Sequence, residues 1–379
     1  MAAPDTVIAG VGVEPFVGRS DRGADALGRA ALARALADAW VDLDDVDLFV
    51  FGSRFEHPAL GQRVLLPLGA TGPTILNTEN ACASGTSALE IAAAYIRAGM
   101  ATIAVAVGVE HPSDLGSSIP LPQWDKLARV GISHPVRYAL EAAKYCAEHG
   151  VDPASLAGVT VKNRTHAAKN PAARFQAPVT LEEVLASPVV AEPLHRLQCC
   201  ANADGAAAAV ITTAEVARSR GAEAVRIRAL VSGSGARYDR HIDLPTVQRL
   251  ALAAFEEAGI GPADVDVAEV YDAFVILEAL NTERLGFAAP GTAATRIAAG
   301  DFTLGSATGP VTNPGGGLLG RGHPLGATGL AQVAEIADQL RGRADGRQVE
   351  GASVGLVQTM GGNVRDLEFN AGAVMVLSR

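Results

Sequence analysis

The chain has 379 residues, of which 49% are hydrophobic and 19% charged, so it can bury a sizeable core and is too apolar for wholesale disorder. Its net charge of −10 argues against nucleic acid as a partner, because phosphate binding needs clustered lysine and arginine. An anionic small ligand needs only a local basic patch and remains compatible with this composition.

Predicted strands and helices alternate through the first part of the chain. We expect strands at residues 7–11, 47–51, 74–79 and 101–109, and helices at residues 24–40 and 82–99. The last of these strands is apolar throughout, as expected when helices cover both faces of a sheet. This alternation predicts an α/β fold with parallel strands joined by right-handed crossovers.

The second part of the chain repeats the order of the first. We expect strands at residues 225–231, 267–271, 353–358 and 373–377, and helices at residues 245–259 and 326–341. Residues 82–99 also resemble residues 323–342 in sequence, which favours a duplication. Two such halves would stack into five layers, α/β/α/β/α.

The region between the halves, residues 115–200, is rich in prolines and polar residues, so we interpret it as an inserted loop or lid. The predicted N-terminal half therefore consists of residues 1–114 and 201–224, and the C-terminal half of residues 225–379.

The longest strongly apolar segment, residues 101–109, is far shorter than the roughly 20 residues that span a bilayer. The N-terminus also lacks a basic region followed by a long apolar stretch, so we expect a cytoplasmic protein without a membrane segment. Four cysteines in a chain of this length do not form a disulfide framework, and we interpret Cys146, Cys199 and Cys200 as buried thiols.

Cys82 is the strongest candidate for a catalytic nucleophile. It lies between a predicted strand and a predicted helix, where ligands bind in open α/β sheets. A thiol at a helix N-terminus is near the positive end of the helix dipole, which favours the thiolate. An arbitrary cysteine is more often a core thiol, but this position and its small neighbours favour function.

His323 and Tyr271 are candidates for proton transfer. His323 lies in the glycine-rich segment GGGLLGRGHPLGATG, residues 315–329, where backbone amides can approach a ligand and hold an oxyanion. A histidine there can deprotonate Cys82, although a turn histidine satisfied by local backbone is the simpler interpretation. Tyr271 ends a predicted strand, and its spacing alone fits an ordinary half-buried tyrosine equally well.

No metal site is expected. The histidines at positions 57, 111, 134 and 195 lack metal-ligand spacing, and the adjacent pair Cys199 and Cys200 has no second pair with which to form a zinc site. We likewise expect no tightly bound cofactor.

Together these motifs resemble those of the thiolase superfamily, over nearly the whole chain. NACASGTSAL, residues 80–89, resembles the thiolase nucleophile motif, and GRGHPLGATG, residues 320–329, is similar to the histidine loop of the second half. CCANADGAAAAVI, residues 199–211, and VKNRTHAAKNPAARF, residues 161–175, resemble the sterol-carrier-protein-type and archaeal branch.

The resemblance implies the thiolase fold, a homodimer or tetramer, and coenzyme A thioester substrates. It also implies that Cys82 is acylated and that His323 activates it. We expect Gly322, Gly361 and Gly362 to support the oxyanion and its loops. Candidates for contacts with substrate or coenzyme A are Lys162, Arg164 and Ser234.

Two features depart from ordinary thiolases. The second catalytic cysteine is missing, because Thr359 stands at its usual place and Ala273 stands where the sterol-carrier type has another. Tyr271, in the motif YDAF, replaces the asparagine or histidine of the oxyanion site.

Three functions therefore remain open. The first is a thiolase-like acyltransferase that makes or breaks a C–C bond on an acyl-CoA or acyl-carrier thioester through a Cys82 acyl-enzyme. The second is a retro-aldolase of the steroid side-chain type, acting on a β-hydroxyacyl-CoA through Tyr271 with a small companion protein that carries a zinc ribbon and an OB fold. The third is a non-catalytic scaffold subunit.

Overall fold

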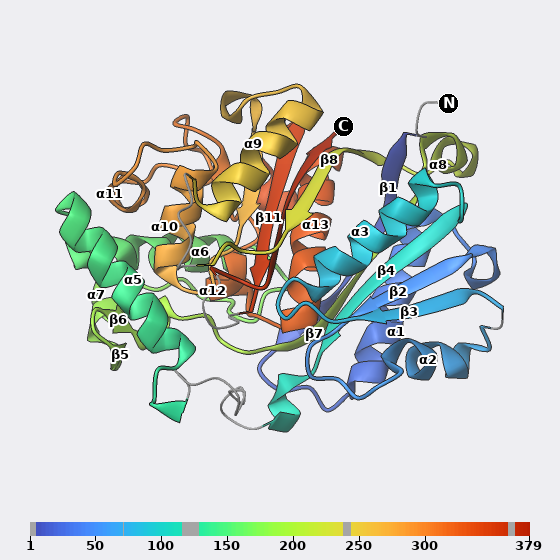
Figure 1. Ribbon diagram of the computed structural model, residues 1–379, viewed down its shortest axis with the longest axis horizontal. Coiled ribbons are helices and arrows are strands. Elements are labelled where there is room, and N and C mark those ends of the chain that lie inside the picture. Colours follow the sequence, from blue (N-terminus) through green and yellow to red (C-terminus); the bar gives the residue numbers. More distant parts are fainter. Residues whose placement is uncertain (1–4, 71, 116–128, 238–243, 363–367) are drawn as a thin grey trace.

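A computed structural model describes the whole chain except residues 1–4, 71, 116–128, 238–243 and 363–367 (Figure 1). The first five strands of the main sheet are β1 (Thr6–Val17), β2 (Leu48–Gly52), β3 (Thr74–Thr78), β4 (Ile103–Glu110) and β7 (Asp204–Thr213). The other five are β8 (Val225–Gly233), β9 (Val267–Val270), β10 (Val311–Thr312), β11 (Val354–Gly361) and β12 (Ala371–Ser378).

The two groups of strands have the same order. The sheet runs β10-β9-β11-β12-β8-β1-β7-β4-β2-β3, and the halves join where β1 pairs with β8 at Val7–Arg226 and Ile8–Val225. From its outer edge inwards, the first half places β3, β2, β4, β7 and β1. The second half places β10, β9, β11, β12 and β8, which is the same order when the strands of each half are numbered along the chain. This shared order is the duplication that the sequence predicts.

Helices separate and cover the two halves of the sheet. Those outside the insert are α1 (Ala24–Ala39), α2 (Leu60–Leu65), α3 (Ser84–Arg97), α8 (Ala214–Arg220), α9 (Thr246–Ala258), α10 (Val275–Arg284), α11 (Ala293–Ala298), α12 (Gly317–Arg321) and α13 (Leu325–Arg341). α3 and α13 contact each other and both contact the sheet, while α1 covers the outer face of the first half and α9 that of the second. The expected α/β/α/β/α layering is thus confirmed.

Small residues allow the two central helices to meet at their N-termini. A Cβ atom on Gly85 of α3 would lie 2.5 Å from the carbonyl oxygen of Gly326 in α13, closer than such atoms approach. Cys82 and His323 lie just before these helices, so this close packing brings the two predicted catalytic side chains to the same place.

The insert is more ordered than we expected. It contains α5 (His134–His149), α6 (Ala157–Ala167), α7 (Leu181–Ala186) and a short hairpin of β5 (Val189–Ala191) and β6 (Leu194–His195). Figure 1 shows these elements, in green, against the C-terminal half, where α6 contacts α10, α11 and α12. Polar residues that suggested a surface loop are buried there in ion pairs and hydrogen bonds.

Within the described part of the chain, no helix is long and apolar enough to cross a bilayer.

Candidate active site

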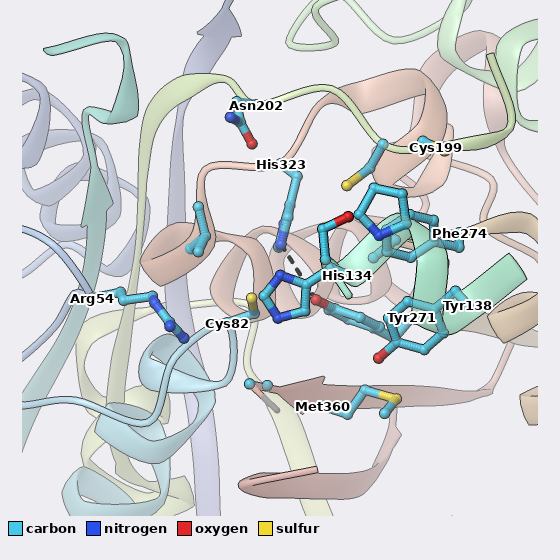
Figure 2. A pocket seen from close by; sticks show the side chains of 17 residues that line it. Arg54, Cys82, His134, Tyr138, Cys199, Asn202, Tyr271, Phe274, His323 and Met360 are labelled. Carbon is cyan, nitrogen blue, oxygen red and sulfur yellow. Dashed lines mark hydrogen bonds between the residues drawn. The ribbon is translucent and has the colours of Figure 1, made fainter. Parts of the chain in front are cut away.

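A cavity of about 560 Å³ lies where the two halves meet the insert. Figure 2 shows the side chains that line it, and Cys82, Tyr271 and His323 are among them. Gly361 and Gly362 line it as well. Residues from strand ends, helix starts and the insert therefore converge on the nucleophile that the sequence predicts.

A tight turn before α3 places Cys82 in this cavity. Ala81 has a left-handed φ of 52°, and the hydroxyl of Ser84 accepts a hydrogen bond from the Asn80 N–H at 2.8 Å and donates to the Ala81 carbonyl at 2.6 Å. The end of β11 packs directly on this turn, since a Cβ on Gly361 would lie 2.7 Å from the Cys82 nitrogen. Only glycine allows that contact.

The surroundings of Cys82 have opposing effects on its thiol. Burial raises the pKa of Cys82, because a thiolate is poorly solvated there. A hydrogen bond from Tyr271, the positive charge of Arg54 and the backbone N–H of Gly362 each favour the thiolate and lower the pKa. The net pKa stays above its ordinary value, so the thiol needs a base.

His323 is held in the tautomer that a base requires. Its Nδ1 lies 2.7 Å from the hydroxyl oxygen of Thr328, whose own proton is donated to the Pro324 carbonyl at 2.9 Å. Thr328 can therefore only accept, which places a proton on Nδ1 and leaves the lone pair on Nε2. Burial, with the charges of Arg321 and Arg54, lowers the pKa of His323 to about 3, so the ring is neutral at physiological pH.

Tyr271 completes the group. Its hydroxyl lies 3.3 Å from Nε2 of His323, and the two rings meet edge to face with centroids 5.8 Å apart. Burial raises the pKa of Tyr271 well above its ordinary value, so the hydroxyl remains a hydrogen-bond donor.

The next residue, Asp272, fixes the histidine loop. Its carboxylate accepts hydrogen bonds from the backbone N–H groups of Leu318 at 2.6 Å and Leu319 at 3.2 Å, in the first turn of α12. Burial and the neighbouring Glu278 raise the pKa of Asp272 to about 8, and these two backbone N–H groups oppose that shift because they favour the charged form. The strand end that carries Tyr271 thus also anchors the segment that leads to His323.

The insert supplies one wall of the cavity. Ser133, His134, Pro135 and Tyr138, at the start of α5, line it, and the Tyr138 ring stacks on Phe274 with centroids 4.5 Å apart. The sequence pattern around His134, which has no metal-ligand spacing, does not show that the helix it begins closes over a site formed by distant residues.

Three further residues were not predicted to line the site. Cys199, Cys200 and Asn202 lie on the segment that crosses the cavity, held there by hydrogen bonds such as Cys200 N–H to the Ala273 carbonyl at 2.8 Å. The two cysteines are half-buried rather than enclosed, and burial raises the pKa of Cys199 to about 12. No local sequence pattern indicates how close these residues lie to Cys82.

Arg54 was also missed. It follows β2, and Figure 2 shows its side chain extending towards Cys82. Its charge lowers the pKa of both Cys82 and His323. The rule that ligands bind beyond the carboxyl ends of parallel strands would have indicated residues 53–55.

The remaining candidates lie elsewhere. The ammonium group of Lys162 is buried in an ion pair with Glu278, away from the cavity. Ser234 lines a separate cavity of about 180 Å³, and Gly322 (φ 95°) packs against residues next to the site without lining it.

Arg164 lines a second cavity, and Thr359 lies in the core. The second cavity, of about 780 Å³, shares Cys199, Cys200 and Asn202 with the first. The hydroxyl of Thr359 lies 3.0 Å from that of Thr86, and Thr359 does not line the catalytic cavity.

Comparison with known proteins agrees with this geometry. The family model "Thiolase, N-terminal domain" matches residues 7–215, and "Thiolase C-terminal domain-like" matches residues 236–379. The chain is 36% identical to the benzoylsuccinyl-CoA thiolase subunit BbsB of Thauera aromatica, over 94% of this chain and 95% of that protein. It is 37% identical to an acetyl-CoA acetyltransferase of Methanothermobacter thermautotrophicus, over 86% and 88% of the two chains.

Human sterol carrier protein 2 is 35% identical over 93% of this chain and 69% of its own length. Among solved structures, the "Ltp2-ChsH2(DUF35) aldolase" matches with a TM-score of 0.83 and 26% identity, over 100% of this chain and 98% of that one. Human mitochondrial 3-ketoacyl-CoA thiolase matches with a TM-score of 0.73 and 18% identity, over 100% and 99%, which supports the fold alone. The chain belongs to the thiolase family and to its branch that includes sterol carrier protein 2 and archaeal acetyl-CoA acetyltransferase.

Proposed function

We propose that this protein is a thiolase-like acyltransferase that cleaves or forms a C–C bond on an acyl-CoA thioester through a Cys82 acyl-enzyme. The observation that carries the proposal is the tautomer of His323, whose unprotonated Nε2 faces the Tyr271 hydroxyl in the cavity that holds the Cys82 thiol. A scaffold subunit would not need a nucleophile and a neutral base held in this way. The named activities of the relatives support the same assignment.

In the cleavage direction, Nε2 of His323 takes the proton of the Cys82 thiol, and the thiolate attacks the β-keto carbon of a β-ketoacyl-CoA. The bond between the α and β carbons breaks, and its electron pair leaves on the shortened acyl-CoA as an enolate. The enolate takes up a proton, and the acyl group stays on Cys82. A second coenzyme A thiol then accepts the acyl group and returns the Cys82 thiol.

No second cysteine is needed for this proton balance. The imidazolium formed on His323 can return its proton to the enolate, and Tyr271 can hydrogen-bond the developing oxyanion through a hydroxyl that stays protonated. Thr359 takes no part, since its hydroxyl is engaged with Thr86 in the core. Coenzyme A enters and leaves as a substrate, so the scheme uses no tightly bound cofactor.

Intact-mass spectrometry after incubation with an acyl-CoA tests the proposal. We expect a mass increase equal to the acyl group, lost in Cys82→Ser and retained in Cys146→Ser, which alters a buried thiol of α5 outside the cavity. The absence of an adduct across short and long acyl-CoAs would contradict the acyl-enzyme.

The second cavity offers a place for the phosphates of coenzyme A. Arg19, Arg164, Arg174 and Arg196 all line it, and the buried Nε of Arg164 has no hydrogen-bond acceptor among the described residues. The Arg164 guanidinium stacks over Phe175, 4.0 Å from the ring centroid. We expect Arg164→Gln to raise the KM for coenzyme A without changing kcat.

A retro-aldolase is the second candidate. It is favoured by the position of Tyr271 beside His323 and by the structural likeness to the Ltp2-ChsH2(DUF35) aldolase. Release of an aldehyde or ketone from a β-hydroxyacyl-CoA, unaffected by Cys82→Ala and lost in Tyr271→Phe, would identify this activity.

We propose a homodimer that extends the sheet at the edge strand β3, which is only partly buried, and a small zinc-ribbon and OB-fold companion protein. The companion is supported by one relative named as a thiolase subunit and by the two components named in the Ltp2-ChsH2(DUF35) aldolase. Light scattering of the purified chain, alone and co-expressed with its companion, would give both stoichiometries.

A further inference from the structure

Arg54 is the unusual charge of the catalytic cavity. Of the seventeen described residues that line it, Arg54 alone carries a permanent charge. Its guanidinium lies 4.9 Å from the centroid of the Phe55 ring, with no hydrogen-bond acceptor or carboxylate partner among the described residues. A half-buried cation that faces the cavity without a counterion can pair with an anionic group of a ligand.

The backbone around Arg54 is firmly held, which keeps this cation in place. The buried carboxylate of Glu110 accepts hydrogen bonds from the backbone N–H of Arg54 at 3.0 Å and of Phe55 at 2.9 Å. The same carboxylate accepts from the Gly326 N–H, in the first turn of α13, at 2.9 Å. Glu110 therefore fixes the loop to the catalytic helix through main-chain contacts and leaves the guanidinium free for a ligand.

Phosphates of coenzyme A are poor candidates for that anion. The whole pantetheine arm separates them from the reacting sulfur, whereas Arg54 is close enough to Cys82 to lower its pKa. Figure 2 shows Arg54 on one side of Cys82, and Tyr138, Phe274 and Met360 on the other. These three side chains are largely apolar and suit the pantetheine arm, which leaves the Arg54 side for the acyl group.

We propose that Arg54 binds a carboxylate on the acyl group transferred to Cys82, so that the substrates are coenzyme A monothioesters of dicarboxylic acids. This inference rests on the proposed function, whose substrate class it names. A guanidinium presents two parallel N–H donors to a carboxylate, and such charge-assisted bonds are about twice as strong as neutral hydrogen bonds. Part of that energy is lost to solvent because the side chain is half-buried rather than enclosed.

The first test measures binding without turnover. Isothermal titration of the Cys82→Ala protein compares succinyl-CoA with butyryl-CoA, which have the same chain length and differ in the terminal carboxylate. We expect succinyl-CoA to bind on the order of 10-fold more tightly, and Arg54→Gln to reduce that ratio to about one. Equal affinities before the substitution, or a ratio that Arg54→Gln leaves unchanged, would overturn the proposal.

The second test needs no coenzyme A. Iodoacetate and iodoacetamide alkylate the Cys82 thiol and differ only in charge, so the ratio of their rates is independent of the thiolate fraction. We expect Arg54→Gln to lower the iodoacetate-to-iodoacetamide ratio by roughly 10-fold. The matched change Arg218→Gln, on the exposed side of α8, should leave the ratio unchanged. A ratio equal in Arg54→Gln and Arg218→Gln would also overturn the proposal.

These outcomes are separate from those of the acyl-enzyme experiment. A carboxylate preference that depends on Arg54, without any adduct on Cys82, would retain the binding site and reject acyl transfer. An adduct formed equally from succinyl-CoA and butyryl-CoA, with no effect of Arg54→Gln, would retain acyl transfer and reject the carboxylate site. If Arg54 instead stabilises the oxyanion, Arg54→Gln would slow acylation by both thioesters equally and leave the ratio of their rates unchanged.

Discussion

The hydroxyl of Tyr271 lies 3.3 Å from Nε2 of His323, the nitrogen that has no proton of its own. Tyr271 also hydrogen-bonds Cys82, so its single proton is shared between the base and the nucleophile that the base must activate. Donation to the sulfur stabilises the thiolate, and donation to His323 occupies the base. The reacting form is therefore the one in which Tyr271 faces the sulfur and Nε2 receives the thiol proton.

Tyr271→Phe should slow modification of Cys82 without preventing it. Loss of the tyrosine hydrogen bond removes one of the interactions that lower the pKa of Cys82, so the thiolate becomes rarer at a given pH. A charge-assisted hydrogen bond of about 1.5 kcal/mol corresponds to roughly 10-fold in the rate of iodoacetamide alkylation at pH 8. An alkylation rate that stays the same or rises in Tyr271→Phe would show that Tyr271 chiefly blocks His323.

Thr328→Val should weaken the base. The valine has the shape of threonine and cannot accept from Nδ1 of His323, so the imidazole is free to adopt the unproductive tautomer. We expect the rate of Cys82 acylation to fall by about 5-fold to 10-fold, corresponding to one hydrogen bond of about 1 kcal/mol. Rapid-quench mass spectrometry measures that rate. Thr328→Ser retains the hydroxyl and should retain most of the acylation, whereas equal losses in both variants would point to packing instead.

Much of this site was visible in the sequence because its main residues lie at turns between regular elements. Cys82 precedes a helix of the first half, and His323 precedes the matching helix of the second half. The local pattern and the duplication together therefore predicted where these two residues lie. The glycines that allow α3 and α13 to meet are also part of these motifs.

Other features depend on partners far away in the chain, which no local pattern reveals. Lys162 resembled a surface charge, yet its partner Glu278 lies 116 positions later. The tautomer of His323 depends on where the Thr328 proton goes, which is a matter of geometry. Arg54 was overlooked because an arginine after a strand is common, and only the cavity shows that it faces Cys82.

The pH dependence of Cys82 modification should reflect the thiol alone. The pKa of His323 is lowered from 6.5 to about 3, so the ring is already neutral above pH 3 and loses no proton between pH 5 and 8. The pKa of Cys82 is raised above its ordinary value of 9.0, so the thiolate fraction still increases at alkaline pH. Iodoacetamide alkylation should therefore rise continuously beyond pH 9 with no inflection near 6.5. An inflection between pH 6 and 7 that disappears in His323→Ala would contradict the lowered histidine pKa.

Lys162→Met should destabilise the protein and leave its affinity for coenzyme A unchanged. The ammonium group of Lys162 is buried against the Glu278 carboxylate and donates to the Thr312 carbonyl at 2.9 Å, outside both the catalytic cavity and the arginine-lined one. Removing one member of a buried ion pair leaves the other charge unpaired, which costs about 3–5 kcal/mol. We expect a clearly lower Tm by calorimetry, an unchanged KM for coenzyme A, and partial recovery of Tm when Glu278→Leu is added. Lys169→Met, an exposed change just after the same helix, should alter neither quantity. A raised KM in Lys162→Met at normal Tm would instead place the coenzyme against α6.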